Sequence, residues 1–309
     1  MQKLEILSVN ISEKKGIVKT PVEQITINET GIAGDAHAGV WHRQVSLLAQ
    51  ESIDRAELKA KTKFPPGTFA ENLTTRGIEL AKTSILDRFV NDEVELEVTQ
   101  IGKKCHSQCA IGQQIGDCIM PAEGIFCRTI KGGTVKEGTQ FQYIPRIFKV
   151  KIVVLSDRAS AGIYEDKSGK LIDKLSKEWF EAKNMKAEIE TVIIPDEKDQ
   201  LIQVVTDSFN KNYDIVFTTG STGIGERDIA PETIAPLLDK QITGIMELVR
   251  VKYGMKNPNA VLSRSLAGTK NKTLLFALPG NPKAVNEYLT EIFSVLFHSL
   301  LMIWGINRH

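Results

Sequence analysis

Residues 213–232 read YDIVFTTGSTGIGERDIAPE, an apolar run that passes directly into a glycine-rich turn and then into acidic residues. The apolar run predicts a buried strand over 213–219. Gly220, Gly223 and Gly225 permit positive φ angles and close approach to the backbone, so consecutive amides there are able to cradle an anion. The spacing matches neither G-x-x-x-x-G-K-[ST] nor G-x-G-x-x-G. Taken alone, the turn is either an anion site or a tight strand-to-helix connection.

Two acidic residues follow the glycines. Asp228 lies in the expected loop and Glu232 in the first turn of the expected helix, with Pro231 as the first helical residue. Carboxylates beside bound phosphates commonly hold Mg²⁺, which takes one or two protein carboxylates and keeps several waters. The alternative is that the acids stabilise the helix N-terminus without any ligand. The pattern leaves both interpretations open for Glu232.

The remainder of the second half alternates strands with helices. The expected strands are 148–156, 187–195 and 272–280, and the expected helices are 169–183, 196–212 and a long one from Pro282. This alternation predicts a three-layer α/β domain over 147–309 with a mainly parallel sheet. Ligands on such sheets bind beyond the carboxyl ends of the strands. The loops 156–168, 218–232 and 279–283 should therefore share one rim, which Asp196 joins only if its strand is also parallel.

Other polar residues of these loops have structural alternatives. Asp196 is well placed as the N-cap of the next helix, and the pattern alone favours that role. Gly280 permits a tight Pro-Gly turn, after which a helix start offers free N–H groups to an anion. Ser156 and Asp157 lie in a long loop, and loops of that length are often functional. Arg264 is either a phosphate donor or a solvated arginine.

The first half of the chain is rich in short strand patterns. Residues 94–101 read VELEVTQI, and the alternation of apolar and polar side chains has the period of a half-buried strand. A helix is expected over 46–61, and short apolar stretches separated by turns continue through Tyr143. The rhythm changes after Pro145. These features predict a β-rich barrel or sandwich over 1–146 with one helical excursion.

Four cysteines, all in the first half, raise a separate question. The segment GKKCHSQC places Cys105 and Cys109 beside His106, and Cys118 and Cys127 follow at longer intervals. This spacing is not that of a standard zinc ribbon or finger. Structural zinc, inert buried thiols and a reactive thiolate stay open as interpretations. The neighbouring lysines and histidine favour the thiolate at Cys105.

Composition and charge exclude several classes of protein. Of the 309 residues 42% are hydrophobic and 25% charged, as in soluble globular domains. The 39 basic and 38 acidic residues leave a net charge of +1, whereas a nucleic-acid binder needs a basic excess. The first residues lack the apolar core of a signal peptide, and no segment is apolar and long enough to cross a bilayer. We therefore expect a cytoplasmic protein that binds small molecules, without nucleic-acid or membrane partners.

Four motifs of the second half together resemble a known family. LSDRASAGIYEDKSG, IPDE, TTGSTGIGERDIAPE and LPGNP occur in the same order as in the molybdopterin adenylyltransferase domain of molybdenum cofactor biosynthesis. The resemblance implies adenylylation of molybdopterin by ATP and Mg²⁺, release of pyrophosphate, and a homotrimer. It also implies that Asp196 and Asp228 are the catalytic acids, so that Asp196 is more than a cap. We expect Asp228 and Glu232 to hold the Mg²⁺.

The expected nucleotide or pterin site combines backbone and side-chain groups. Its residues are Ser156, Asp157, Gly220, Ser221, Thr222, Gly223, Glu232, Ser263, Arg264, Pro279, Gly280 and Asn281. Because Mg²⁺, carboxylates and backbone amides together stabilise the charge of an adenylyl transfer, no P-loop lysine is needed. Two positions depart from the family, which usually has glycine at Ser221 and often serine at Ala277. If the backbone at Ser221 has a positive φ, the serine costs of order 1 kcal/mol and weakens nucleotide affinity.

Motifs of the first half resemble the MOSC domain. They are GIAGDAHAG (31–39), RQVSLLAQESI (43–53), FAENLTT (69–75), LEVTQIGKKCHSQC (96–109) and KGGTVKEGTQF (131–141). The resemblance implies a barrel-like domain that carries sulfur or binds molybdenum cofactor through a cysteine, and Cys105 matches that position. His37 and Arg43 are candidate pocket residues, with a turn histidine and a surface arginine as the alternatives.

The two resemblances lead to one leading hypothesis, a bifunctional enzyme of molybdenum cofactor biosynthesis. Adenylylation belongs to the second half and cofactor or sulfur handling to the first, with the molybdate-insertion enzyme of the pathway as an expected partner. The alternative is a non-catalytic carrier of pterin or molybdenum cofactor, which Ser221 motivates. A zinc-stabilised interaction scaffold is a third hypothesis.

Overall fold

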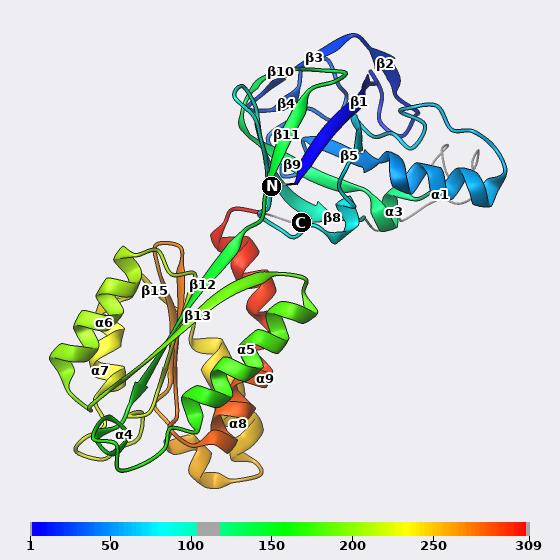
Figure 1. The fold of residues 1–309 in the computed structure, drawn as a ribbon. Helices are drawn as coiled ribbons and strands as arrows, with labels where there is room; N and C mark the ends of the chain where they lie inside the picture. The colour runs from blue at the N-terminus through cyan, green and yellow to red at the C-terminus, as the bar shows by residue number, and fades with distance from the viewer. Residues whose placement is uncertain (1, 104–117, 307–309) are drawn as a thin grey trace. The chain divides into compact units, whose positions relative to one another are not determined.

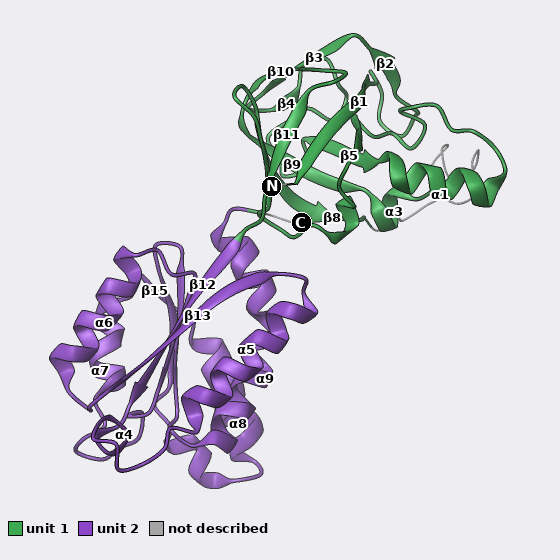
Figure 2. Ribbon diagram, in the orientation of Figure 1, with its two compact units in different colours: residues 1–146, 306–309 green, residues 147–305 purple. Residues whose placement is uncertain are grey.

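The computed structural model describes residues 2–103 and 118–306 (Figure 1). The chain forms two compact units, one extending to Arg146 and including the C-terminal residues from Ile306, the other spanning Ile147–Gly305 (Figure 2). Among the described residues, none of the helices is both long enough and apolar enough to cross a membrane.

The first unit is built from short strands and few helices. Its strands are β1 (Lys3–Ile11), β2 (Thr20–Val22), β3 (Gln24–Asn28), β4 (Gly31–Ile32), β5 (Val45–Ala49), β6 (Leu73–Arg76), β7 (Arg88–Val90), β8 (Glu95–Ile101), β9 (Ile125–Lys131), β10 (Gly133–Lys136) and β11 (Gln140–Ile144). Its helices are α1 (Gln50–Ala60), the 3₁₀ turn η1 (Leu80–Lys82) and α3 (Met120–Glu123).

The large sheet of the first unit closes on itself. Its strand order is β11-β7-β8-β9-β5-β6-β1-β2, and β11 also pairs with β1, so seven strands form a closed barrel. The core inside it is apolar and includes Phe89, Phe141 and Cys127, each almost fully buried. The predicted β-rich, barrel-like fold is confirmed.

The second unit is a six-stranded sheet between helices. Its elements are β12 (Ile147–Leu155), α4 (Asp157–Ser160), α5 (Ser168–Ala182), β13 (Lys186–Ile194), α6 (Lys198–Asn210), β14 (Ile215–Thr219), α7 (Ala230–Ile234), η2 (Ala235–Leu237), β15 (Lys240–Gln241), α8 (Thr243–Gly254), η3 (Pro258–Leu262), β16 (Leu266–Lys270), β17 (Thr273–Leu278) and α9 (Pro282–Ile303). The strand order is β13-β12-β14-β17-β16-β15, with the first four strands parallel and the last two antiparallel.

Helices cover both faces of this sheet. Helices α6 and α7 lie on one face and α5, α8 and α9 on the other (Figure 1). Central strands such as β14 and β17 are buried at every position, as expected for strands covered on both sides. The predicted three-layer α/β architecture with a mainly parallel sheet is confirmed.

Two local predictions are wrong. The helix expected over 46–61 begins only at Gln50, because Val45–Ala49 form the fully buried strand β5. A short apolar run has no periodicity that separates strand from helix. Pro231 is the second residue of α7, not the first, since the helix begins at Ala230.

Candidate functional site

The carboxyl ends of four parallel strands meet at one edge of the second unit. In register, Leu155 of β12 is paired with Ile194 of β13, and Thr219 of β14 is paired with Leu278 of β17. The loops that follow these strands surround a cavity of about 580 Å³. Because β13 is parallel to β12, the loop that carries Asp196 belongs to the same rim.

Several of the predicted site residues line this cavity and others do not. Those on its wall are Ser156, Asp157, Asp196, Gly220, Ser221, Asp228 and Gly280. Those absent from its wall are Thr222, Gly223, Glu232, Ser263, Arg264, Pro279 and Asn281. Of the second group, Arg264 hydrogen-bonds to the glycine turn.

Asp157 and Asp196 are tied to each other across two loops. The Asp157 N–H donates to Oδ2 of Asp196 at 3.1 Å, and the Asp196 N–H donates to Oδ1 of Asp157 at 3.0 Å. Asp196 does not cap the next helix, because the N-cap position belongs to Glu197, which makes no side-chain capping bond. The capping role predicted for Asp196 is therefore wrong, since its carboxylate is engaged across the sheet edge.

The pKa values of the two carboxyl groups are shifted in opposite directions. The Asp196 N–H, followed by the guanidinium of Arg227, lowers the pKa of Asp157. Burial, together with the neighbouring charge of Asp157, raises the pKa of Asp196. Two adjacent acids whose pKa values are pushed apart are common at functional sites.

Asp228 is held inside the glycine turn. Its Oδ2 accepts a hydrogen bond from the Gly225 N–H at 2.8 Å. A methyl group on Gly223 would lie 2.6 Å from the same oxygen, and one on Gly225 would lie 3.0 Å from it. An alanine at position 223 would therefore displace the Asp228 carboxylate, and one at position 225 would press against it.

Ser221 adopts the left-handed conformation, with φ of 57°. Its hydroxyl donates to the carbonyl of Arg227 at 3.0 Å and accepts from the Ile229 N–H at 2.9 Å. The condition under which serine is costly at this position, a positive φ, is therefore met. The same side chain closes the loop that carries Asp228, which the sequence did not predict.

Glu232 and Arg264 pair with each other. Arg264 also donates to the carbonyl of Gly223 at 2.6 Å and to that of Asp228 at 2.9 Å. The guanidinium thus fastens the glycine turn from behind. The Glu232 carboxylate and the Arg264 guanidinium are thus each other's partners here, and their roles as metal ligand and phosphate donor stay predictions.

The Pro-Gly turn at 279–280 packs against the glycine-rich turn that begins at Gly220. A methyl group on Gly280 would lie 3.2 Å from the Cα of Gly220, and Gly220 itself has φ of 103°. Thr219 donates through Oγ1 to the carbonyl of Pro279 at 2.7 Å. Asn281 caps α9, accepting from the Lys283 N–H at 2.8 Å.

Sequence reasoning missed three further residues of the cavity. Asp166 is buried and accepts from the Gly169 N–H at 2.8 Å, at the start of α5. Ser168 donates to the carbonyl of Gly280 at 2.7 Å. Arg227 pairs with Asp157. The available signals were the D-x-S-G spacing before a helix and the basic residue directly before Asp228.

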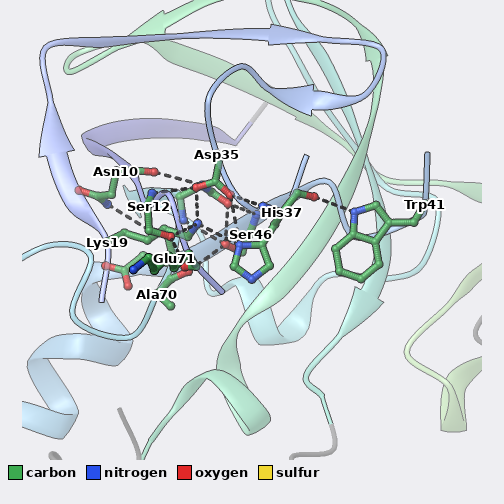
Figure 3. Close-up of polar contacts among 11 residues, drawn as sticks. Asn10, Ser12, Lys19, Asp35, His37, Trp41, Ser46, Ala70 and Glu71 are labelled. Carbon is green, nitrogen blue, oxygen red and sulfur yellow. Dashed lines mark hydrogen bonds and ion pairs between the residues drawn. The ribbon is translucent and has the colours of Figure 1, made fainter. Parts of the chain in front are cut away.

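The first unit contains a buried polar cluster (Figure 3). Lys19 and Asp35 form an ion pair in which both side chains are almost fully buried. The Asp35 carboxylate also accepts from the His37 N–H at 2.9 Å and from Nδ2 of Asn72 at 3.1 Å. Burial opposes ionisation of Asp35, but hydrogen bonds from His37 and Lys19 hold its pKa well below the usual range.

Two candidates for the pocket of the first unit lie near this cluster. His37 is half-buried, and its Nδ1 lies 3.2 Å from Oδ1 of Asp35. Trp41 donates from its indole to the carbonyl of His37 at 2.8 Å. Arg43 is half-buried, and its guanidinium lies 4.7 Å from the Trp41 ring and 5.8 Å from that of Phe126.

Two of the four cysteines, Cys118 and Cys127, lie in the described residues, where Cys118 is half-buried and Cys127 is buried. Cys105 and Cys109, with His106, lie outside the described residues. Cys127 lies in the barrel core, where burial raises the pKa of its thiol well above the ordinary value, so this cysteine is the inert buried thiol that was one interpretation. Among residues 2–103 and 118–306, no group of three or more His, Cys, Asp or Glu is arranged to hold a metal ion.

Comparison with known families assigns a class to each unit. Residues 34–142 match the MOSC domain. Residues 151–298 match a family described as a probable molybdopterin binding domain. The two matches follow one another along the chain in the order expected.

Curated relatives narrow the class of the second unit. The chain is 37% identical over 158 residues to the molybdopterin adenylyltransferase of Helicobacter pylori J99, covering 50% of this chain and 88% of that one. It is 36% identical to the enzyme of the same name from Pyrococcus furiosus, covering 91% of it, and 33% identical to that of Escherichia coli K12, covering 73%. Through its second unit, the chain belongs to the molybdopterin adenylyltransferase family. It is therefore a protein of molybdenum cofactor biosynthesis.

Proposed function

We propose that the second unit transfers the adenylyl group of ATP to the terminal phosphate of molybdopterin. The observation that carries this proposal is the cavity at the carboxyl ends of four parallel strands. Three carboxylates, those of Asp157, Asp196 and Asp228, line it beside glycine backbone. This edge is where ligands of parallel sheets bind, and the chain's relatives bear the name of this activity.

The proposed reaction is one displacement at phosphorus. An oxygen of the molybdopterin phosphate attacks the α-phosphorus of ATP, and a new phosphorus–oxygen bond forms. The bond from that phosphorus to the bridging oxygen breaks, and pyrophosphate leaves with the electron pair. Fixed dipoles aimed at the developing charge stabilise such a step. Ser168 and Pro282, at the N-termini of α5 and α9, line the cavity, so the positive ends of two helix dipoles lie beside the proposed phosphate position.

The acids have distinct proposed roles. Asp228, fixed by the Gly225 N–H, faces the cavity from the glycine turn. Asp196, with its raised pKa, is suited to accept a proton from the attacking phosphate. Asp157 stays ionised beside it and orients the Asp196 backbone.

The donor set fits Mg²⁺. This ion takes one or two carboxylates and completes its shell with water and substrate phosphates, so it needs no cage of three protein ligands. Asp228 is the proposed ligand, with Asp196 or Asp157 as the second in place of Glu232, which pairs with Arg264. When bound, Mg²⁺ supplies charge stabilisation at the phosphates.

We propose that the first unit binds molybdenum cofactor or carries sulfur, with Cys105 as the reactive thiol. The support is the match to the MOSC domain and the buried cluster around Asp35. His37 and Arg43, beside Trp41, are the proposed pocket residues. Lys103, next to the cysteine segment, adds positive charge that favours the thiolate.

Assembly and location complete the proposal. Helix α8 and its C-cap residue form an exposed apolar stripe in which Leu248, Val251 and Met255 are 51%, 65% and 85% exposed. Val261 and Leu262 lie on η3, which packs beside α8. A stripe of this kind supports association with further copies, and we propose a homotrimer. We also propose a cytoplasmic protein that delivers its product to the molybdate-insertion enzyme of the pathway.

Pyrophosphate release from pure protein with molybdopterin, ATP and Mg²⁺ tests the enzymatic proposal. We expect Asp228→Asn to reduce molybdopterin-dependent release by about 100-fold or more. Asp199→Asn is the matched control, because Asp199 is an exposed acid of α6 that does not line the cavity. Equal rates for wild type and Asp228→Asn, or pterin binding without any turnover, would contradict the enzymatic proposal. The protein would then be a carrier of pterin.

A further inference from the structure

Arg227 is a cation on the cavity wall that already has partners. Its Nη2 lies 2.9 Å and 2.8 Å from the two carboxylate oxygens of Asp157, and its Nε lies 3.2 Å from Oδ2. The same Nη2 donates to Oε1 of Glu197 at 3.2 Å. The guanidinium therefore joins the glycine turn to the two loops across the cavity.

These pairings contribute little to the stability of the fold. The Arg227 side chain is 60% exposed, and its partners Asp157 and Glu197 are 46% and 54% exposed. Exposed ion pairs contribute about 0–1 kcal/mol. The backbone of Arg227 is held separately, because its carbonyl accepts from the Ser221 hydroxyl. The side chain is thus free to change partners while the turn stays in place.

The cavity has an excess of negative charge. Its acids are Asp157, Asp166, Asp196, Glu226 and Asp228, and its bases are Arg158, Lys167 and Arg227. A nucleotide brings further negative charge into this space, so a well-placed cation is needed. Arg158 lies over the ring of Tyr164, at 5.4 Å. Arg227 alone of these bases presents its fork to paired carboxylate oxygens, the geometry that also fits a phosphate.

We infer that Arg227 is the phosphate-binding side chain of the cavity and that Asp157 and Glu197 hold it until nucleotide arrives. The inference rests on the proposed function, since the ligand is the phosphate chain of ATP. A phosphate is a stronger bidentate partner than two exposed carboxylates, so the guanidinium moves from acid to ligand. Glu197 competes with ATP for Arg227 without touching the ligand itself.

Equilibrium binding of ATP, measured calorimetrically on the full chain in Mg²⁺ buffer, tests this exchange. We expect Arg227→Gln to weaken binding by about tenfold or more. We expect Glu197→Gln to tighten it by about twofold to fivefold, because one competitor is removed. In the Arg227→Gln background, Glu197→Gln should change nothing. Lys198→Gln, an exposed neighbour outside the cavity wall, is the charge control and should stay within about twofold.

The outcomes separate the inference from the proposed function. If Arg227→Gln binds ATP as tightly as wild type, the inference is overturned while the proposed activity stands. If Glu197→Gln tightens binding equally in both backgrounds, its effect is simple charge removal and the competition is overturned. If wild type binds neither ATP nor inorganic pyrophosphate, the assignment of the cavity to a nucleotide is wrong, and the inference about Arg227 is wrong as well. Arg227→Lys, which keeps the charge but loses the fork, should bind with intermediate affinity.

Discussion

Replacing Ser221 by glycine restores the residue that the family usually has at a position where φ is 57°. The substitution removes both the backbone strain of a serine at positive φ and the hydrogen bonds of its hydroxyl, and these two effects on loop stability oppose each other. A serine in the left-handed region costs about 1 kcal/mol, and glycine abolishes that cost. The hydroxyl makes two hydrogen bonds, to the carbonyl of Arg227 and from the N–H of Ile229. At about 0.5–1.5 kcal/mol each, they contribute about 1–3 kcal/mol.

Because the two hydrogen bonds contribute as much free energy as the backbone strain costs, or more, we expect glycine at position 221 to loosen the loop. The Ser221→Gly variant should lose between about 0 and 2 kcal/mol of the free energy that keeps residues 221–229 closed. Ser221→Ala keeps the strained backbone and loses both bonds, so it should lose about 1 kcal/mol more than the glycine variant. The expected order of loop stability is therefore serine, glycine, alanine.

Native-state hydrogen exchange at the Ala230 amide measures this free energy, since that N–H donates to the backbone carbonyl of residue 221 at 3.0 Å, an acceptor that both variants keep. Ser299→Ala is the control, because it deletes a serine hydroxyl bond on α9 far along the chain. Slower exchange in Ser221→Gly than in wild type would refute the reasoning and show that strain outweighs the hydrogen bonds. Equal exchange in the glycine and alanine variants would show that the positive φ costs nothing.

Three further predictions concern other features of the two units. Gly223→Ala places a methyl group 2.6 Å from Oδ2 of Asp228, so pyrophosphate release should fall by about 100-fold, whereas Gly244→Ala, where the methyl meets no atom within 4 Å, should leave release unchanged. Because the pKa of Asp196 is raised in the folded state, the stability it contributes is complete below the usual carboxyl value of 3.8 and is lost as pH rises through the raised pKa. Asp196→Asn should therefore be more stable than wild type at neutral pH and equal or less stable in acid, as urea midpoints across pH will show. Lys19→Met leaves Asp35 buried without its cation, so it should lower the free energy of unfolding of the first unit by about 3–5 kcal/mol. The double variant with Asp35→Asn should regain part of this loss. Trp41 fluorescence during urea unfolding measures the free energy of unfolding in each variant.

Much of the fold follows from the sequence because its patterns are local. The strand that ends at Thr219 and the helix from Pro282 are long or strongly apolar segments, and the alternation of strands with helices predicts the parallel sheet. The shared rim was predictable in the same way, since parallel strands end at one edge. The strand β5 was missed because five apolar residues carry no distinguishing period.

The pairing of charged residues in the site was not predictable. Asp157 and Asp196 lie in different loops, and their reciprocal bonds depend on strand register. Glu232, on α7, and Arg264, between η3 and β16, come together only in the folded unit, so neither sequence neighbourhood shows the partner. The positive φ of Ser221 was predictable from its place among glycines, but the hydroxyl bridge to residues 227 and 229 depends on the return of the loop.

The contact between Gly220 and Gly280 gives the cavity a property that its loops alone do not have. Gly220 directly follows β14, and Gly280 follows β17 after one residue, Pro279; the two strands are paired in register up to Thr219 and Leu278. An added methyl group at position 280 meets backbone that the sheet hydrogen bonds prevent from retreating. The width of the cavity here is therefore fixed by the spacing of two adjacent strands, a dimension common to all parallel sheets. If the ligand of this cavity changed during evolution, we expect the wall at Gly220 and Gly280 to change least. The loops opposite, which are lined by side chains, should change most.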